Sequence, residues 1–247
     1  MKVTVPVPGV ARLEHAGVNC YVLTGEGGAT VVDAGLPRTW SGLPGALAAV
    51  GCGLEDVRAL VLTHAHFDHL GFARRLSREQ GIDVWVHPQD ARLAAHPYRY
   101  AHENPRAVYP IRHPRGLPIL TSMLVAGAAR VPGVRVVRHL RTGRALDVPG
   151  RPSVVACPGH TDGHVALHLP DRGVLLSGDA LVTLDPYTGR TGPRIVAGAA
   201  TADSALNLAT LDALAATGAR VVLPGHGEPW TGGAAEAVRL ARVAGAA

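Results

Sequence analysis

Three imidazoles and one carboxylate lie within six residues, in the run His64-Ala65-His66-Phe67-Asp68-His69. Imidazole nitrogen and carboxylate oxygen are good ligands for zinc and similar metals. The run follows the apolar stretch 59–62, which predicts a buried strand whose end can aim side chains at one point. His64 and His66 are two residues apart and leave the same face of extended chain, whereas Asp68 and His69 follow the turn. The spacing therefore indicates two metals side by side.

The same arrangement recurs three times later in the sequence: a short apolar strand, a Gly or Pro turn, and a ligand-type residue. These later residues are His160 in CPGHTDGH, Asp179 in SGDA and His226 in LPGHG. Glycines at such turns let the backbone approach a metal closely. A single histidine is usually a surface or core residue, but seven ligand-type residues at strand ends indicate a site. The candidate metal ligands are His64, His66, Asp68, His69, His160, Asp179 and His226.

The combined motif, HxHxDH at 64–69 followed by PGHTxGH, GD and GHG in that order, resembles the metallo-β-lactamase-fold hydrolase superfamily, in its glyoxalase II and lactonase-like branch. The resemblance covers the whole chain and implies an α/β fold, an αβ/βα four-layer sandwich. It implies that His64, His66 and His160 hold one metal, that Asp68, His69 and His226 hold the other, and that Asp179 bridges them. It also implies that His164 orients a ligand without binding metal. We expect two Zn²⁺ per chain, with iron or manganese as the alternative.

From such a two-metal centre we expect hydrolysis without a covalent enzyme intermediate. A hydroxide shared by two cations is a nucleophile at neutral pH, and both cations can polarise a carbonyl. Asp68 is the candidate catalytic residue, since it could pass a proton to the leaving group. The GxSxG motif of serine hydrolases does not occur. We therefore expect an ester, thioester or lactone of a small molecule as substrate.

The bond that is cut stays open at this stage. Hydroxyacylglutathione thioesterases share the ligand set but carry an extra helical region after it, and here 21 residues follow His226. Related lactone hydrolases often place a Tyr three residues after the bridging Asp, where this chain has Val182, with Tyr187 farther along. Zinc β-lactamases generally lack the bridging Asp. The alternatives are a mononuclear-iron sulfur oxidoreductase, similar to persulfide dioxygenases, a phosphodiesterase, or a binding protein without catalytic activity.

Composition fits a compact enzyme that acts on small molecules. The chain has 247 residues, 47% of them hydrophobic, which supports a sizeable core. We see no signal peptide and no membrane-length apolar run, and the three cysteines, including Cys157, fit reduced thiols in a cytoplasmic protein. The net charge is +5, but the basic residues are scattered and aromatic residues make up 4%. This disfavours nucleic acid as a partner and leaves a mild attraction for anionic small substrates.

The predicted elements fall into two similar halves within a single domain, residues 1–247. In the first half we expect strands within 18–32 and at 58–62 and 84–86, and helices at 40–50, 70–79 and 88–95. In the second half we expect strands near 134–138, 153–157, 164–169, 174–177 and 220–223, and helices near 202–216 and 233–244.

Between the halves, the segment from about 97 to 132 contains Tyr98, Tyr100 and Tyr109 and an apolar stretch at 119–129. We expect this inserted segment to act as a lid over the metals, with one of the tyrosines touching substrate. The alternatives are a surface elaboration or a contact in a homodimer.

Overall fold

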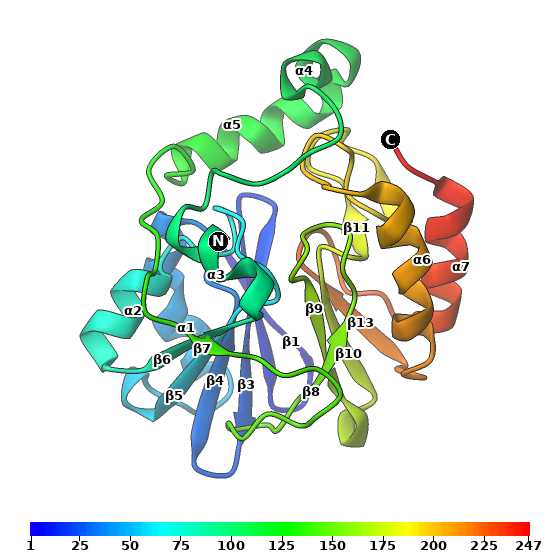
Figure 1. The fold of residues 1–247 in the computed structure, drawn as a ribbon. Coiled ribbons are helices and arrows are strands. Elements are labelled where there is room, and N and C mark those ends of the chain that lie inside the picture. Colours follow the sequence, from blue (N-terminus) through cyan, green and yellow to red (C-terminus); the bar gives the residue numbers. More distant parts are fainter.

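Two β-sheets face each other and helices cover their outer faces, so the chain forms four layers (Figure 1). The computed structural model describes all 247 residues. The larger sheet has seven strands in the order β1-β2-β3-β4-β5-β6-β7, and the second has four in the order β13-β10-β9-β8. A separate two-stranded sheet pairs β11 with β12. The predicted α/β class and αβ/βα sandwich are therefore confirmed.

The larger sheet begins as an antiparallel meander and continues with three parallel strands. Its strands are β1 (Lys2–Val7), β2 (Val10–His15), β3 (Val18–Gly25), β4 (Gly28–Val32), β5 (Val57–Val61), β6 (Asp83–Val86) and β7 (Arg138–His139). The other strands are β8 (Ser153–Ala156), β9 (Val165–Leu169), β10 (Val174–Gly178), β11 (Val182–Leu184), β12 (Thr191–Arg194) and β13 (Val221–Pro224). The strand predicted near 134–138 is reduced to the two residues of β7. The strands β1, β2, β11 and β12 were not predicted.

Seven α-helices complete the layers: α1 (Leu43–Ala48), α2 (Ala73–Gln80), α3 (Ala91–Ala95), α4 (Tyr109–Arg112), α5 (Leu117–Val125), α6 (Ser204–Ala215) and α7 (Ala234–Ala244). The predicted helix 40–50 is shorter because the chain before Leu43 forms a 3-10 turn. The predicted helix 70–79 begins only at Ala73, since the Gly71 N–H donates to the Gly35 carbonyl at 2.7 Å instead of joining a helix. α6 begins where expected because Asp203 caps it by accepting the Leu206 N–H at 2.7 Å.

The apolar residues divide into an inner layer and two outer layers. Leu23 and Val61 meet Leu167 and Leu176 between the two sheets. On the outer face of the larger sheet, the layer of α1 to α3 contributes residues such as Leu47 and Leu76, and on the other side α6 and α7 contribute Leu211, Leu214 and Val238. Strand β10 is buried along its whole length, as an apolar run predicts for a strand covered on both faces. The strands therefore form a rigid base for the loops at their carboxyl ends. None of the helices combines the length and apolar character needed to cross a lipid bilayer.

The segment 97–132 contains α4 and α5 and lies across one edge of the sandwich (Figure 1). Met123 of α5 packs with Val18 and Leu36 of the first half. Tyr109 of α4 packs with Ala197 and Ala199 and its ring lies 5.8 Å from that of Tyr187, all in the second half. The segment therefore bridges the two halves at this edge.

Candidate metal centre

The seven predicted ligand residues converge from four loops, each of which follows the carboxyl end of a strand. The loop after β5 carries four of them, and the loops after β8, β10 and β13 carry one each: His64, His66, Asp68 and His69, then His160, Asp179 and His226. All seven are buried, and the most exposed is Asp68 at 7%. The structure thus brings every one of these residues to one place, at the edge that the segment 97–132 covers.

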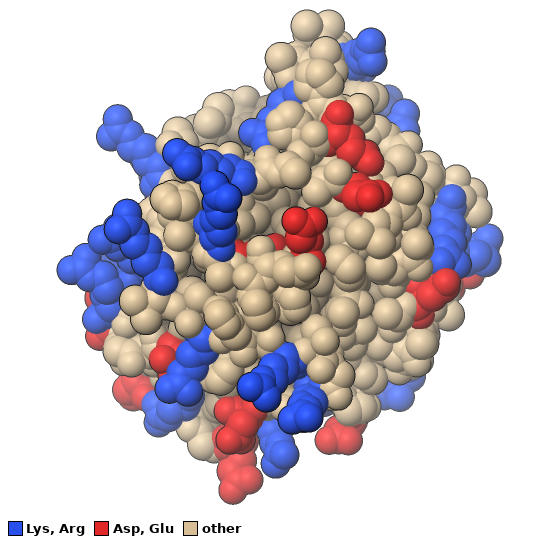
Figure 2. Space-filling model, viewed as in Figure 1, with Lys and Arg blue, Asp and Glu red and all other residues tan.

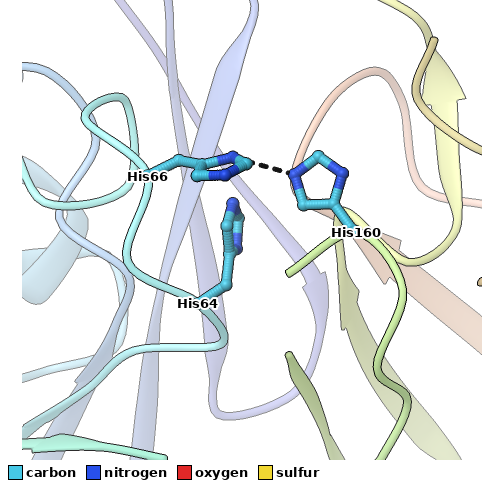
Figure 3. A group of neighbouring side chains, drawn as sticks. All are labelled: His64, His66 and His160. Atoms are coloured by element: carbon cyan, nitrogen blue, oxygen red, sulfur yellow. Dashed lines mark hydrogen bonds between the residues drawn. The ribbon is translucent and has the colours of Figure 1, made fainter. Parts of the chain in front are cut away.

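The ligand atoms form three overlapping groups, and within each group they lie within 4.8 Å of one another. The groups are His64, His66 and His160; His64, His69 and Asp179; and Asp68, His69 and His226. In the first group the three rings point toward a common position, and His160 Nε2 lies 3.0 Å from His66 Nδ1 (Figure 3). A cation at this position could bind the nitrogen lone pairs of all three rings.

Asp179 lies between the groups. Its Oδ2 atom is 3.1 Å from His226 Nε2, 3.6 Å from His160 Nε2 and 3.9 Å from His64 Nε2. Its Oδ1 atom is 3.4 Å from His69 Nε2. One carboxylate therefore faces residues of both predicted metal sites, which is the position of a bridging ligand.

Three buried polar atoms at the middle of this cluster have no hydrogen-bond partner in the protein: Nε2 of His64 and His69, and Oδ1 of Asp179. An unsatisfied buried polar atom costs about 1–3 kcal/mol, so a cluster of them indicates a ligand that satisfies them together. Nitrogen and carboxylate oxygen donors in this number fit zinc, and they also suit iron and manganese. The residues present therefore fit a pair of divalent cations.

Asp33, which was not among the candidates, orients two of the histidines. Thr63 donates its hydroxyl to Asp33 Oδ2 at 2.9 Å and lies 3.0 Å from His64 Nδ1. Asp33 Oδ2 is also 3.1 Å from His69 Nδ1. With Nδ1–H directed outward, both rings present Nε2 to the centre. The sequence carried a signal for this role, since Asp33 directly follows the apolar strand β4, as the candidate ligands follow their strands.

His160 and His226 are oriented in the same way, by an acceptor at Nδ1. The Nδ1 atom of His160 is 3.2 Å from the hydroxyl of Thr201, which donates to the Val196 carbonyl and so accepts from the ring. The Nδ1 atom of His226 is 2.7 Å from the Gly17 carbonyl. A carbonyl can only accept, so Nδ1 carries the proton and Nε2 faces the carboxylates.

Asp90 ties two of the metal loops together. Its Oδ2 accepts the Ala65 N–H at 3.0 Å and the Thr161 hydroxyl at 2.8 Å, and its Oδ1 accepts the Gly163 N–H at 2.9 Å. Burial raises the pKa of Asp90 to about 6 despite these donors. Nothing in the local sequence around Asp90 indicated this role, because its partners come from two distant loops.

His164 lies behind the centre, as expected. Its Nε2 accepts the backbone N–H groups of Asp179 and Ala180, and its Nδ1 is 3.2 Å from the Cys157 sulfur. Burial keeps the pKa of His164 well below its usual value, so the ring is neutral and Nε2 is free to accept. Cys157 is fully buried and packs with residues such as Ala166, as expected for a small apolar residue.

The pKa values of the histidines in the centre are shifted in opposite directions. Burial lowers the pKa of His64 and His66 well below the usual value, and it lowers that of His160 to about 4. Burial also acts against the charged forms of His69 and His226, but the neighbouring carboxylates, Asp179 foremost, outweigh it. The pKa of His69 is therefore raised well above its usual value, and that of His226 is raised to about 10.

Two buried polar residues, one on β2 and one on β3, form hydrogen bonds with the loop that carries His226. Arg12 donates to the Gly227 carbonyl at 2.9 Å and pairs with Glu228 at 2.6 Å. Asn19 donates to the Pro224 and Gly227 carbonyls at 2.8 Å each. These residues were not predicted, because their partners are more than 200 positions away in the sequence.

The three tyrosines of the segment 97–132 have different roles. The Tyr100 ring lies 4.0 Å from that of His66 and beneath the Arg106 guanidinium, which is 4.1 Å from its centroid. The Tyr98 hydroxyl donates to the Ala128 carbonyl and accepts the Val131 N–H, both at 2.7 Å. The Tyr109 hydroxyl donates to the Ala247 carbonyl at 2.9 Å. Tyr100 is thus the tyrosine that lies against a candidate ligand.

Tyr187 lies next to Tyr100, whereas Val182 is a buried residue of β11. Burial raises the pKa of Tyr187 well above its usual value, and Tyr100 and Asp68 raise it further. The phenol of Tyr187 is therefore protonated. The sequence had indicated Tyr187 as a substitute for the missing tyrosine at 182 but gave no reason to prefer it.

The family model described as the metallo-beta-lactamase superfamily matches residues 14–226. The chain belongs to this superfamily. It is 31% identical over 228 residues to an uncharacterised protein of Mycobacterium tuberculosis, covering 87% of this chain and 88% of that protein. It is 29% identical over 221 residues to a probable metallo-hydrolase of Bacillus subtilis, covering 85% of this chain and 67% of that protein.

Solved structures agree with this membership. A metallo-beta-lactamase family protein from Thermus thermophilus superposes with a TM-score of 0.68 at 30% identity, covering 96% of this chain and 80% of that one. A second structure, described as a di-iron-bound form, superposes with a TM-score of 0.59 at 26% identity and covers 94% of each chain. A stretch of 59 residues, 23% of this chain, is 42% identical to a hydroxyacylglutathione hydrolase of Rhizobium meliloti. The likeness to this hydroxyacylglutathione hydrolase covers less than a quarter of the chain, whereas the superfamily model covers most of it.

Proposed function

We propose that this chain is a metal-dependent hydrolase that holds two zinc ions and cleaves an ester, thioester or lactone bond of a small molecule. The observation that carries this proposal is the position of Asp179, whose two oxygens face His69 on one side and His64, His160 and His226 on the other. A relative described as a probable metallo-hydrolase supports the reaction class. Two bound cations would supply Lewis acidity and a water of lowered pKa.

Asp68 is the residue that we propose as proton carrier. Its Oδ2 atom lies 3.4 Å from His226 Nε2. Asp68 is also the most exposed of the seven candidate ligands, so it is the one that a leaving group can reach. Tyr100 covers His66 on the side of the segment 97–132 and excludes water there, which supports the proposed role of this segment as a lid.

Iron is the alternative metal, because a structural relative at 26% identity is described in a di-iron-bound form. A mononuclear-iron sulfur oxidoreductase would need only one set of three ligands. The second set, Asp68, His69 and His226, is complete and buried here. This favours a two-metal hydrolase over that alternative.

The test is metal analysis of protein purified without added metal, followed by assays with thioesters, lactones, phosphodiesters and β-lactams. We expect about two zinc ions per chain and hydrolysis of a thioester or lactone. Asp179→Asn should lose both metal and activity, whereas Asp171→Asn, on the surface turn between β9 and β10, should change neither. About one iron per chain with no hydrolysis of any panel member would contradict the proposal.

A further inference from the structure

A cavity of about 350 Å³ opens beside the candidate metal centre, on the side of His160. His160, a candidate ligand, and Tyr100, which lies against His66, form part of its lining, so the cavity adjoins the candidate centre. Arg92 of α3 and Arg99 of the following segment also line it, and Asp162 lies on the loop after β8. Figure 2 shows basic side chains standing over this part of the face beside a hollow, with acidic side chains across it.

The two arginines have no partner within the protein. By contrast, arginines such as Arg12, Arg138 and Arg242 each form an ion pair with a carboxylate of the chain. Neither Arg92 nor Arg99 takes part in any ion pair or side-chain hydrogen bond of the chain. Their guanidinium groups are therefore free to bind a ligand.

The backbone that carries both arginines is fixed. Asp90 binds the loops after β5 and after β8 through three hydrogen bonds of 2.8–3.0 Å, and Arg92 follows two residues later. Arg99 lies between Tyr98, whose hydroxyl makes two hydrogen bonds of 2.7 Å, and Tyr100, which lies between His66 and the Arg106 guanidinium. Both side chains are exposed at the mouth of the cavity, so a ligand that enters can reach their guanidinium groups.

We propose that this cavity binds an anionic group of the substrate, a carboxylate, through Arg92 and Arg99. The inference rests on the proposed hydrolase function and adds its substrate class: esters or thioesters whose tail ends in a carboxylate. A guanidinium binds a carboxylate through charge-assisted and often bidentate hydrogen bonds. Two carboxylates of the lining, Asp90 and Asp162, oppose an anion. Three donors partly offset the charge of Asp90, so Asp162 is the carboxylate that can be changed without breaking hydrogen bonds.

The first experiment compares two thioesters on the metal-loaded protein. S-acetyl-mercaptopropionate ends in a carboxylate, and S-acetyl-mercaptopropanamide has the same shape without the charge. We expect a higher kcat/KM for the first, and a loss of this preference by about tenfold in Arg92→Gln or Arg99→Gln, chiefly through KM. Asp162→Asn should increase the preference for the charged thioester, because it removes a negative charge from the lining. Arg112→Gln, on α4 outside the cavity, is the matched control and should leave it unchanged.

The second experiment measures binding without turnover, by calorimetry with N-acetyl-β-alanine and its neutral amide. We expect the charged probe to bind more tightly, and Arg92→Gln and Arg99→Gln to remove most of that difference. If binding depends on the arginines but no thioester, ester or lactone is hydrolysed, the carboxylate site stands and the hydrolase function fails. If thioesters are hydrolysed but the variants treat charged and neutral compounds as the parent does, the carboxylate site is wrong.

Discussion

His164 Nε2 accepts the backbone N–H of Asp179 at 3.0 Å and that of Ala180 at 3.2 Å. The contact joins the loop after β8 to the loop after β10, and it fixes the backbone from which the Asp179 carboxylate reaches the four histidines. A glycine is needed next to it: Gly178 has a φ of +51°, and a Cβ there would lie 2.8 Å from His164 Nε2. His164 is therefore a positioning residue for the Asp179 carboxylate, which faces residues of both predicted metal sites.

His164→Leu should weaken metal retention by about 10–100-fold, because it leaves two buried N–H groups unpaired and frees the Asp179 backbone. His164→Gln should recover part of this, since its side-chain oxygen can accept in place of Nε2. His168→Leu, on β9 and without such contacts, is the control. Chelator competition would measure the affinities, and equal metal retention in all three variants would contradict the role.

Asp68→Asn should lower kcat far more than it raises KM, because the amide keeps an oxygen for the metal but cannot carry the proton. Metal analysis of the variant would check that the centre remains loaded. A kcat within about tenfold of the parent, a barrier change of about 1.4 kcal/mol, would show that Asp68 is not the proton carrier.

Gly225→Ala should disrupt the centre, because a Cβ at this position would lie 2.0 Å from Asp179 Oδ1 and 2.8 Å from His69 Cε1. We expect loss of metal and of activity, measured by metal analysis and assay. Gly45→Ala in α1 is the control, since no atom lies within 4 Å of the place that its Cβ would take and its backbone is helical. That variant should gain about 0.5–1 kcal/mol in unfolding free energy. A fully metal-loaded Gly225→Ala protein would contradict the close approach.

Metal loading should release protons. In the metal-free protein the pKa of His226 is about 10, so this ring is protonated at pH 7–8, and Asp179 raises the pKa of His69 in the same direction. Because a metal binds the neutral ring, the apparent metal affinity should rise by about tenfold per pH unit for each proton displaced. Calorimetry in buffers of different ionisation enthalpy would count the protons. Zero released protons at pH 7 would contradict the charged state of the His226 ring.

The same raised pKa fixes the sign of a stability change. The contribution of protonated His226 to the stability of the metal-free protein is complete below its unfolded pKa of about 6.5. It is lost as the pH rises through the folded pKa of about 10. The Tm of the metal-free protein should therefore fall between about pH 6.5 and 10. In the His226→Gln variant, the Tm should fall less over this pH range, because the titrating ring is absent.

Tyr100→Ala should change substrate preference and lower kcat/KM, because it removes the ring that covers His66. Tyr100→Phe keeps the ring and should act like the parent unless the hydroxyl contacts substrate. Tyr98→Phe should instead cost stability, about 1 kcal/mol for each hydrogen bond lost, without altering preference. If Tyr100→Ala keeps the parent's rate and preference, the segment 97–132 is not a lid.

Much of the fold and the ligand set could be predicted from sequence because both are local properties. An apolar run such as 59–62 predicts a buried strand, and the glycine or proline after a strand predicts the loop that carries a ligand. Two of the elements that were missed are short: β11 has three residues, and β12 has four, among them Thr, Gly and Pro, so neither shows an apolar periodicity. The helices that were too long lacked a local signal for their first residue, which backbone contacts with other loops decide.

By itself the sequence determined the residues that could bind metal, since residue type and position at a strand end are local. Only the tertiary structure decided their surroundings: that Asp33 orients His69, that Asp90 joins two loops, and that Tyr100 rather than Tyr98 covers the centre. These partners are set by how the strands pair and by how α3 and the segment 97–132 pack on the loops. Such contacts join residues distant in the chain, so no local pattern specifies them.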